Sequence, residues 1–420
     1  MKGFHNKEKG IGILYDDIYL VNGMRTPFGK LCGTIGQVSP TDLGIYAAKA
    51  AMEKSEIKPT DIDQIFVANI GQSSPDTYFL PRHIGLYAGI PFGIPSVMLQ
   101  RICGSGFETI IAGAEQISLG KAGISLCGGT ENMSLSPTAA FGNRMGYALG
   151  KPGFVDMLWE ALNDTAAVPM GCTAENVAKK HNITKNDANE FAKLSVDRAM
   201  AAIESGFYKE EILPMNTTVF EAEGLKPRKV FLPRGVKDFA KDEHIRASTM
   251  EEMAKLPPVF MKDGVQNAAN SSGIVDGSAM VVVAHKNSVK EKNMKPLTKV
   301  VASATSALDP SVMGLGPVPA IKLILEMTGL KVSDIGLVEI NEAFAAQFIG
   351  CERELGLDRN KCNVNGGAIA IGHPLAATGA RLSLTISREM NLRKVKYGIA
   401  SACIGGGQGT AILFENVTHP

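Results

Sequence analysis

The strongest constraint on the fold of this 420-residue chain is an internal repetition. The segment IKPTDIDQI at 57–65 matches LKVSDIGLV at 330–338, which places Asp61 opposite Asp334 at an offset of 273 (334 − 61). A second pair, KAGIS at 121–125 and KYGIA at 396–400, has an offset of 275 (398 − 123). Two matches at nearly the same offset predict two copies of one structural unit, related by a pseudo-two-fold axis. Chance similarity between short segments is the alternative.

Each copy alternates short apolar runs with helical periodicity. In the first copy, residues 18–21 and 65–68 are typical of strands, and residues 41–55 are typical of a helix. Alternating strands and helices predict an α/β sheet. The length of the chain exceeds what one hydrophobic core usually serves, so we expect two or three domains.

The segment from about 134 to 258 has no counterpart in the other copy. It contains amphipathic stretches, most clearly residues 184–204 with Thr184 as the N-cap, and a basic irregular run at 226–234. We interpret it as a largely helical insertion. The predicted domains are a first half at 1–133, completed by about 264–295, an inserted loop domain at 134–263, and a second half at 296–420.

Charge and cysteine content exclude several classes of protein. Lys plus Arg (43) nearly equals Asp plus Glu (42), which argues against binding of nucleic acid or of an anionic membrane through bulk charge. No apolar run is long enough to span a membrane. The seven cysteines include no C-x-x-C pair, so neither a disulfide framework nor a zinc site is expected. We expect reduced thiols and a cytoplasmic location, because residues 1–17 resemble neither a secretory signal nor a transit peptide.

Cys103 is the first candidate for chemistry. It precedes Gly104-Ser105-Gly106, and the pattern predicts a thiol at a sharp bend that opens a helix. The positive end of a helix favours the thiolate, and free backbone N–H groups there can bind an oxyanion. The alternative is a small buried cysteine beside packing glycines.

Two further positions place reactive side chains beside turns or glycines. Asn341 follows an apolar strand, where α/β sheets carry functional groups, although it could equally cap a turn. His373 lies between Gly372 and Pro374, and histidine is the usual general base near neutral pH. A lone surface or core histidine is the alternative.

Cys403 lies at the end of an apolar strand, just before the glycine-rich run GGGQG at 405–409. No Lys-Ser/Thr pair follows this run, so a P-loop is not expected. A metal site built from Cys103, His373 and Cys403 matches no common zinc spacing, and we predict no metal. The offset of 275 places Cys103 opposite Thr378, so the second copy should contribute groups other than a thiol at its equivalent bend.

Together these stretches resemble the thiolase family. The resemblance runs from about residue 18 to 414, and four blocks carry it: CGSG at 103–106, NEAFA at 341–345, NGGAIAIGHP at 365–374 and CIGGGQG at 403–409. Supporting matches are RTP at 25–27, GGTENMS at 128–134, MGCTAEN at 170–176 and GLGPVPA at 314–320.

The resemblance implies an α/β fold of duplicated βαβαβαββ halves in a layered α-β-α-β-α arrangement, with the insertion in the first half. It implies an acyltransferase that cleaves a 3-oxoacyl-CoA with CoA, or runs the reverse Claisen condensation, by a ping-pong mechanism. Cys103 would carry the acyl group, His373 would activate it, and Cys403 would move protons. One oxyanion site would use His373 with a water held by Asn341, and the other the backbone N–H groups of Cys103 and Gly405.

The same resemblance implies contacts for the substrates, acyl-CoA and CoA. Acyl and pantetheine contacts fall on Met170, Ser272, Met313 and Phe344, and Arg246 matches a residue near the adenine. The basic run of the insertion would suit the CoA phosphates. No permanently bound cofactor is expected. A homodimer or tetramer is expected, with residues 134–151 as a candidate tetramer contact, and a requirement for a helper subunit is left open.

Some positions depart from the family pattern and leave the substrate open. Gln100 and Ala269 stand where many members have asparagine and glycine. Pro169 stands where acetoacetyl-specific members usually carry histidine, which favours a degradative enzyme for longer or bulkier chains. A short-chain acetyl-CoA acetyltransferase, an enzyme for a branched or aromatic substrate such as benzoylsuccinyl-CoA, and a catalytically silent acyl- or lipid-binding subunit are the alternatives. A ketoacyl synthase is less favoured, because Cys403 and Asn341 differ from its Cys-His-His site.

Overall fold

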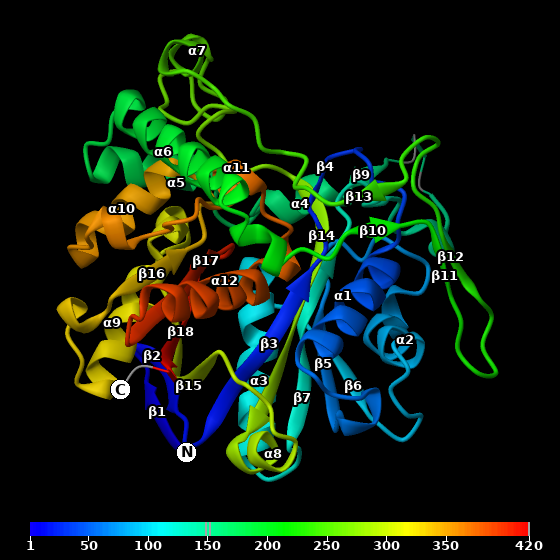
Figure 1. Cartoon of the computed structure of the whole chain (residues 1–420). Coiled ribbons are helices and arrows are strands. Elements are labelled where there is room, and N and C mark those ends of the chain that lie inside the picture. The colour runs from blue at the N-terminus through cyan, green and yellow to red at the C-terminus, as the bar shows by residue number, and fades with distance from the viewer. Residues whose placement is uncertain (148, 151–152, 419–420) are drawn as a thin grey trace.

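The computed structural model describes residues 1–147, 149–150 and 153–418. Its first half is a sheet in the order β6-β5-β7-β14-β3, with helices on both faces (Figure 1). The elements of this half are β3 (Ile18–Arg25), α1 (Pro40–Lys54), β5 (Gln64–Ala68), α2 (Leu80–Tyr87), β6 (Ser96–Leu99), α3 (Ser105–Ser118), β7 (Ile124–Glu131) and β14 (Val275–His285). The expected strands at 18–21 and 65–68 and the helix at 41–55 are therefore present.

The second half repeats this order. Its sheet runs β16-β17-β18-β15, and an isolated parallel bridge between Val338 and Cys362 occupies the fifth position. The elements are β15 (Thr298–Ala307), α9 (Pro317–Thr328), β16 (Leu337–Ile340), α10 (Ala345–Leu355), α11 (Ala368–Ile371), α12 (Thr378–Arg393), β17 (Tyr397–Ile404) and β18 (Gln408–Asn416). The predicted duplication is confirmed.

Strand register fixes which residues of the two halves correspond. The pair Ile65↔Leu126 of β5 and β7 corresponds to Val338↔Ile399 of β16 and β17, which is the smaller of the two sequence offsets (338 − 65 = 273). The repeated KPTD and KVSD segments form matching 3-10 turns, in which the carboxylate at the end of each turn accepts the backbone N–H of Lys58 (2.9 Å) or Lys331 (2.8 Å).

This register corrects one expectation. The 3-10 turn at Ile102–Gly104 precedes α3, and the turn at Leu375–Ala377 precedes α12. The counterpart of Cys103 is therefore Ala376. Thr378, which the larger offset placed opposite Cys103, is the first residue of α12.

The two sheets and their helices form the expected α-β-α-β-α layers (Figure 1). Helices α3 and α12 pack against each other in the middle layer, where their apolar side chains share one core cluster with both sheets. Helices α1 and α2 cover the first sheet, and α9 and α10 cover the second. The sheets join at one edge, where Thr298 and Lys299 of β15 pair with Leu20 and Tyr19 of β3.

Three smaller additions lie at the edges of the sheets. A hairpin of β1 (Lys2–Asn6) and β2 (Gly10–Leu14) extends the second sheet, because β2 pairs with β15. The short β4 (Gly29–Lys30) pairs with β14, and α8 (Lys286–Glu291) leads from β14 toward the second half. Among the described residues, no helix combines the length and the apolar character needed to cross a bilayer.

The residues between β7 and β14 mix helices with short ribbons. The helices are α4 (Met157–Leu162), α5 (Met170–Lys180), α6 (Lys185–Glu204) and α7 (Met250–Lys255). The ribbon strands are β8 (Thr138–Ala139), β9 (Val155–Asp156), β10 (Met215–Asn216), β11 (Thr218–Phe220), β12 (Arg228–Val230) and β13 (Asp238–Phe239). Thr184 caps α6 as expected: its hydroxyl accepts the backbone N–H of Asp187, whose carboxylate accepts the N–H of Thr184.

The two turns that precede the middle helices cross between the halves. The turn at Ile102–Gly104, which contains Cys103, packs on β17 of the second half. The turn at Leu375–Ala377, just after His373, packs on β7 of the first half. This exchange brings polar residues from distant parts of the sequence to one place between the sheets.

Candidate active site

Cys103 lies on a strained turn. Ile102 has a φ of 41°, in the left-handed region that a β-branched residue rarely adopts. The Ser105 hydroxyl supports the turn, since it accepts the N–H of Arg101 and donates to the carbonyl of Ile102, each at 2.7 Å. Helix α3 begins directly afterwards, so the predicted bend at the start of a helix is present.

Burial favours the neutral form of the Cys103 thiol. The residue is only 4 % exposed, and burial raises the pKa of its thiol to about 11. Backbone N–H groups of Gly405 and of Cys103 itself donate to the sulfur and oppose this shift. The expectation that the helix terminus favours a thiolate is therefore wrong for this state, because loss of solvation outweighs the backbone donors. Attack by this sulfur requires a base.

His373 provides a neutral imidazole in the same region. The residue is 6 % exposed, and burial, together with the charge of Arg381, lowers the pKa of the ring to about 3. Its Nδ1 lies 2.6 Å from Oγ1 of Thr378, and its Nε2 lies 3.3 Å from Nδ2 of Asn341. With the amide donating to Nε2, the ring proton resides on Nδ1 and is donated to Thr378. The single lone pair of Nε2 then accepts the Asn341 amide, and it must exchange this contact for the incoming proton.

Cys403 belongs to a small apolar cluster. It is fully buried and shares a hydrophobic cluster with Met313 and Ala343, against which Met170 and Phe344 pack. Burial raises the pKa of the Cys403 thiol well above its usual value, and the neighbouring Cys103 and Cys351 raise it further. Burial thus favours the neutral form of both candidate thiols, and Cys103 lies close enough to Cys403 to raise its pKa.

A single loop, residues 270–273, holds the Asn341 and His373 segments together. The N–H of Ser272 donates to the carbonyl of Ala343 (3.0 Å), and the N–H of Ala345 donates to the carbonyl of Asn270 (2.9 Å). On its other side, the carbonyl of Gly273 accepts the N–H of His373 (2.9 Å). The sequence-predicted Ser272 therefore lies at the join of the site.

Arg246 lies apart from this group. It is exposed and lines a cavity of about 360 Å³ beside His244, Ser248 and residues of α11. Ala269 and Ile369 also line this cavity, so it opens next to the loop that carries Ser272. The position suits the outer part of an elongated ligand whose reactive end reaches Cys103.

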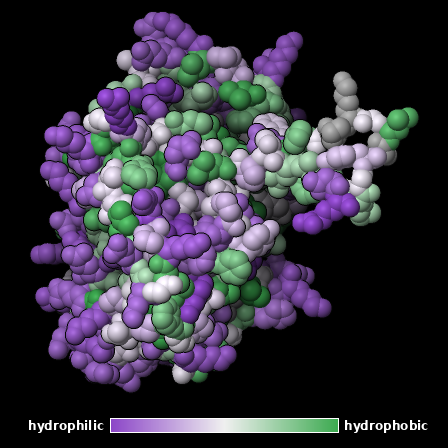
Figure 2. Space-filling model, turned by 90° about the vertical axis from the view of Figure 1, so that its right-hand side faces the viewer, coloured by the Kyte–Doolittle hydropathy of each residue, from purple (hydrophilic) through white to green (hydrophobic). Residues whose placement is uncertain are grey.

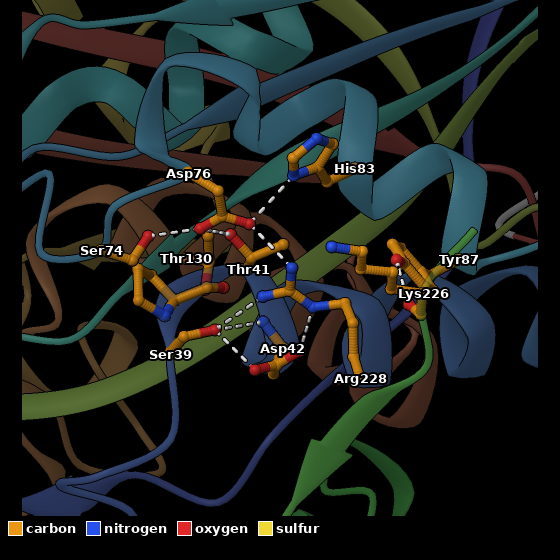
Figure 3. Close-up of polar contacts among 11 residues, drawn as sticks. Ser39, Thr41, Asp42, Ser74, Asp76, His83, Tyr87, Thr130, Lys226 and Arg228 are labelled. Atoms are coloured by element: carbon orange, nitrogen blue, oxygen red, sulfur yellow. Dashed lines mark hydrogen bonds and ion pairs between the residues drawn. The ribbon is translucent and has the colours of Figure 1, made fainter. Parts of the chain in front are cut away.

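The basic run at 226–234 does not lie at this cavity. Arg228, on β12, donates to Asp42 on α1 (2.5 Å) and to Asp76 before α2 (2.8 Å), as Figure 3 shows. Asp76 also accepts from Ser74 and Thr41 and shares a hydrogen bond with Nδ1 of His83 (2.9 Å). Partial burial opposes ionisation of Asp76, but these contacts outweigh it and lower the pKa of the carboxyl to about 2. Arg228 thus connects the insertion to the first half, and binding of CoA phosphates by the basic run stays a prediction.

Buried acceptors around the site were not recognised in the sequence as functional. Glu131 accepts from the N–H groups of Gly71 (2.8 Å) and Ala376 (3.2 Å). Glu342, next to Asn341, accepts from Ser195 (2.6 Å) and Asn363 (2.8 Å).

Thr378 was also missed as the hydrogen-bond partner of His373, and its position five residues along the chain was the one available signal. Within the described part of the chain, no group of three or more His, Cys, Asp or Glu side chains is arranged to hold a metal ion.

Comparisons with known proteins cover nearly the whole chain. The family model "Thiolase, N-terminal domain" matches residues 18–287, and "Thiolase, C-terminal domain" matches residues 294–416. The chain is 42% identical over 402 residues to mitochondrial 3-ketoacyl-CoA thiolase of Bos taurus, covering 95% of this chain and 98% of that protein. It is 41% identical to acetyl-CoA acetyltransferase of Syntrophomonas wolfei, covering 95% and 99%. The crystal structure of human mitochondrial 3-ketoacyl-CoA thiolase in complex with CoA superposes with a TM-score of 0.90 at 41% identity, covering 95% and 98%.

Proposed function

The chain belongs to the thiolase family, and we propose that it cleaves a 3-oxoacyl-CoA with CoA through an acyl-enzyme on Cys103. The observation that supports this most is that Cys103 lies near Cys403, and Asn341 contacts His373, with all four side chains buried near the turns that cross between the halves. CoA is a substrate in this reaction, and no permanently bound cofactor takes part.

In the first half-reaction, Nε2 of His373 takes the proton of Cys103 as its sulfur attacks the 3-oxo carbon. The bond between C2 and C3 breaks, the acyl group stays on Cys103, and the electron pair leaves on C2 of acetyl-CoA. Cys403 donates its proton to that carbon. The resulting products are acetyl-CoA and an acyl-enzyme.

In the second half-reaction, the thiol of a new CoA attacks the acyl-enzyme. Its proton passes to the Cys403 thiolate, and the departing Cys103 sulfur takes back the proton held by His373. Two thiols are needed because a nucleophile that is bound as a thioester cannot also transfer protons. Each half-reaction thereby restores the groups that the next one uses.

The two negatively charged oxygens of this reaction require separate donors. The N–H groups of Cys103 and Gly405, which both donate to the sulfur, would bind the oxygen of the acyl carbonyl. Protonated Nε2 of His373, with a water held by Asn341, would bind the thioester oxygen of acetyl-CoA. A resting proton on Nδ1 leaves Nε2 ready for both duties.

We further propose that the natural acyl group is longer than acetoacetyl. The apolar side chains of Met170, Met313 and Phe344 cluster with Cys403, and Pro169 adds no polar group at the start of α5. Such a lining stabilises an alkyl or aryl chain rather than a small polar one. Met170 and Phe344 are partly exposed and carry this preference.

Assembly and location are separate proposals. Figure 2 shows an arm that projects from the body of the molecule and carries apolar side chains. Residues between β8 and β9 supply large exposed apolar groups, namely Phe141, Met145, Tyr147, Leu149 and Phe154. Exposed apolar area of this kind favours association, and we propose a homodimer or tetramer. We also propose a cytoplasmic location.

The test follows CoA-dependent loss of the enolate absorbance of acetoacetyl-CoA, 3-oxohexanoyl-CoA, 3-oxododecanoyl-CoA and 3-oxo-3-phenylpropionyl-CoA. We expect turnover of all aliphatic substrates, with a higher kcat/KM for the two longer chains, and none with Cys103→Ala. A maximum on acetoacetyl-CoA would contradict the proposed chain length. Equal inactivity of wild type and Cys103→Ala on every substrate would contradict the reaction itself.

A further inference from the structure

The turn that follows His373 lies on the first half of the molecule, which also carries Cys103. Gly129 of β7 is so close to this turn that a Cβ there would collide with the carbonyl oxygen of Ala376. A Cβ on Gly106, in the first turn of α3, would lie 2.7 Å from the same oxygen. The position of Ala376 is thus set by two backbone surfaces of the first half, one of which belongs to the helix that Cys103 precedes.

Glu131 adds a polar connection at the same place. Its side chain is fully buried, and Oε2 accepts the N–H of Ala376 (3.2 Å) and that of Ile70 (3.1 Å). Its Oε1 accepts the N–H of Gly71 (2.8 Å) and Nδ2 of Asn69 (3.1 Å). One carboxylate therefore joins the end of β7, the loop after β5 and the turn after His373.

The symmetry of the halves gives a reason for this carboxylate. In the register that relates the two sheets, Glu131 ends β7 where Ile404 ends β17. Ile404 packs against the turn of Cys103, since a Cβ on Gly104 would lie 2.5 Å from Cδ1 of Ile404. Glu131, at the corresponding position in the first half, packs against the turn after His373. There its carboxylate accepts a backbone N–H of the turn, whereas Ile404 makes only an apolar contact.

Ala376 and Cys103 belong to one hydrophobic cluster, together with Ala68, Ile70, Met133 and Leu375. A shift of the Ala376 turn therefore moves His373 relative to the sulfur that it must deprotonate. Proton transfer requires the two heavy atoms to approach within hydrogen-bond distance, so a displacement of about 1 Å is costly in rate.

We propose that Glu131 is a positioning residue for acyl transfer, whose buried carboxylate holds the turn after His373 in place against the Cys103 segment. The inference rests on the proposed thiolase reaction, in which His373 takes the proton of Cys103. Glu131 touches neither the reacting atoms nor CoA in this role, and it acts through His373.

Glu131→Gln is the informative substitution. In glutamine, one carboxylate oxygen is replaced by an NH₂ group, which faces N–H groups and cannot accept from them. Either Ala376 and Ile70, or Gly71 and Asn69, therefore lose their acceptor. The measured reaction is single-turnover acetylation of Cys103 by acetyl-CoA, in which the acetyl group moves from one thiol to another and CoA leaves with a proton. We expect this rate to fall about 10–100-fold, with less than a twofold change in the dissociation constant of CoA.

Alkylation of Cys103 by iodoacetamide separates position from charge. Burial raises the pKa of Glu131 itself to about 7, and its ionised form raises the pKa of the Cys103 thiol, so removal of this charge alone does not lower the thiolate fraction. We expect alkylation to be unchanged or faster in Glu131→Gln, while acetylation is slower. Slowing of both reactions by the same factor would show a general distortion around the sulfur and would overturn the inference.

Glu175→Gln is the matched control. Glu175 is also buried, and its carboxylate accepts two backbone N–H groups, those of Val265 (2.8 Å) and Gln266 (2.9 Å), whereas Glu131 accepts three, including that of Ala376. We expect a similar loss of thermal stability with acetylation of Cys103 within about threefold of wild type. Equal slowing in both glutamine variants would leave nothing specific to Glu131 and contradict the proposal.

Two more variants separate action through His373 from a merely structural role. In a His373→Ala background, Glu131→Gln should change acetylation less than threefold, because the group it positions is gone. An undiminished effect would refute action through His373.

Gly129→Ala, which displaces the Ala376 turn from the same side, should slow acetylation as Glu131→Gln does. Normal rates in both variants would overturn the inference. Failure of wild type to acetylate at all would instead refute the proposed function.

Discussion

Oγ1 of Thr378 lies 2.6 Å from Nδ1 of His373, and both side chains are buried. Asn341 occupies the other ring nitrogen at 3.3 Å. With one partner on each nitrogen, the imidazole is held in one orientation and in the tautomer whose lone pair is on Nε2, where a proton from Cys103 would replace the Asn341 contact. Thr378 thus orients the histidine, as the third residue of a catalytic triad orients its base.

Thr378→Val should reduce kcat for 3-oxoacyl-CoA cleavage by on the order of 10–100-fold, since the loss of a buried hydrogen bond of about 1.5–3 kcal/mol corresponds to that range of rates. Valine has nearly the shape of threonine, so the fold should be retained. Thr378→Ser keeps the hydroxyl and should stay within about threefold of wild type. Steady-state kinetics of the three proteins, with circular dichroism as the control for folding, would decide; equal rates in the valine and serine variants would contradict the role.

The acidity of the two catalytic candidates predicts the pH dependence of alkylation. The pKa of Cys103 is raised to about 11 and that of His373 is lowered to about 3, so the resting pair is thiol and imidazole rather than thiolate and imidazolium. Below its pKa, a thiol gains about tenfold in thiolate fraction per pH unit. The rate of iodoacetamide modification at Cys103 should therefore rise steadily from pH 6 to pH 10.

Peptide mass spectrometry can resolve Cys103 from the exposed Cys32, which serves as the internal reference. A plateau in the Cys103 rate near pH 7 would mean that an ion pair with His373 already exists, contrary to the neutral pair. In Cys103→Ser, modification at position 103 should disappear, while Cys32 should react as before.

Short-range features of the site were predictable from the sequence, whereas its long-range connections were not. The bend at Cys103 and the cap at Thr184 depend on neighbours within a few residues, and local patterns report those directly. The strain at Ile102 was not predictable, because a β-branched residue argues against a left-handed φ and only the surrounding packing imposes it.

Partners that lie far apart in sequence explain the remaining differences. Glu131 and Ala376 are 245 residues apart, and Arg228 lies 186 residues from Asp42. A carboxylate or an arginine in a sequence does not indicate which backbone or which acid it meets. The basic run at 226–234 therefore suggested a phosphate ligand, although Arg228 has internal partners. The repeat correctly predicted the duplicated fold. Its two offsets differ slightly, however, and the larger one wrongly paired Thr378 with Cys103.

The two cysteines should separate into distinct functions. Cys403→Ser should still form an acetyl-enzyme on Cys103 with acetyl-CoA, because the departing thiolate of CoA is a weak base that needs little assistance. Cleavage of a 3-oxoacyl-CoA creates a far more basic carbanion, so its rate should fall by on the order of 10²–10⁴-fold without the acid. Intact-protein mass spectrometry and turnover assays measure the two effects, and equal losses in both would contradict the assignment of Cys403 as the acid.

The Arg228 contacts predict a loss of stability without a loss of CoA binding. Arg228→Met leaves the carboxylates of Asp42 and Asp76 without their shared cation in a largely buried setting (Figure 3), which should destabilise the protein by about 2 kcal/mol. The KM for CoA should not change, because Arg228 lies away from the cavity beside Arg246. Lys229→Met, one residue along the same strand and exposed, is the control and should alter neither quantity. Urea unfolding and CoA titration test this pair. A raised KM for CoA in the Arg228 variant at unchanged stability would instead indicate that the basic run at 226–234 binds CoA.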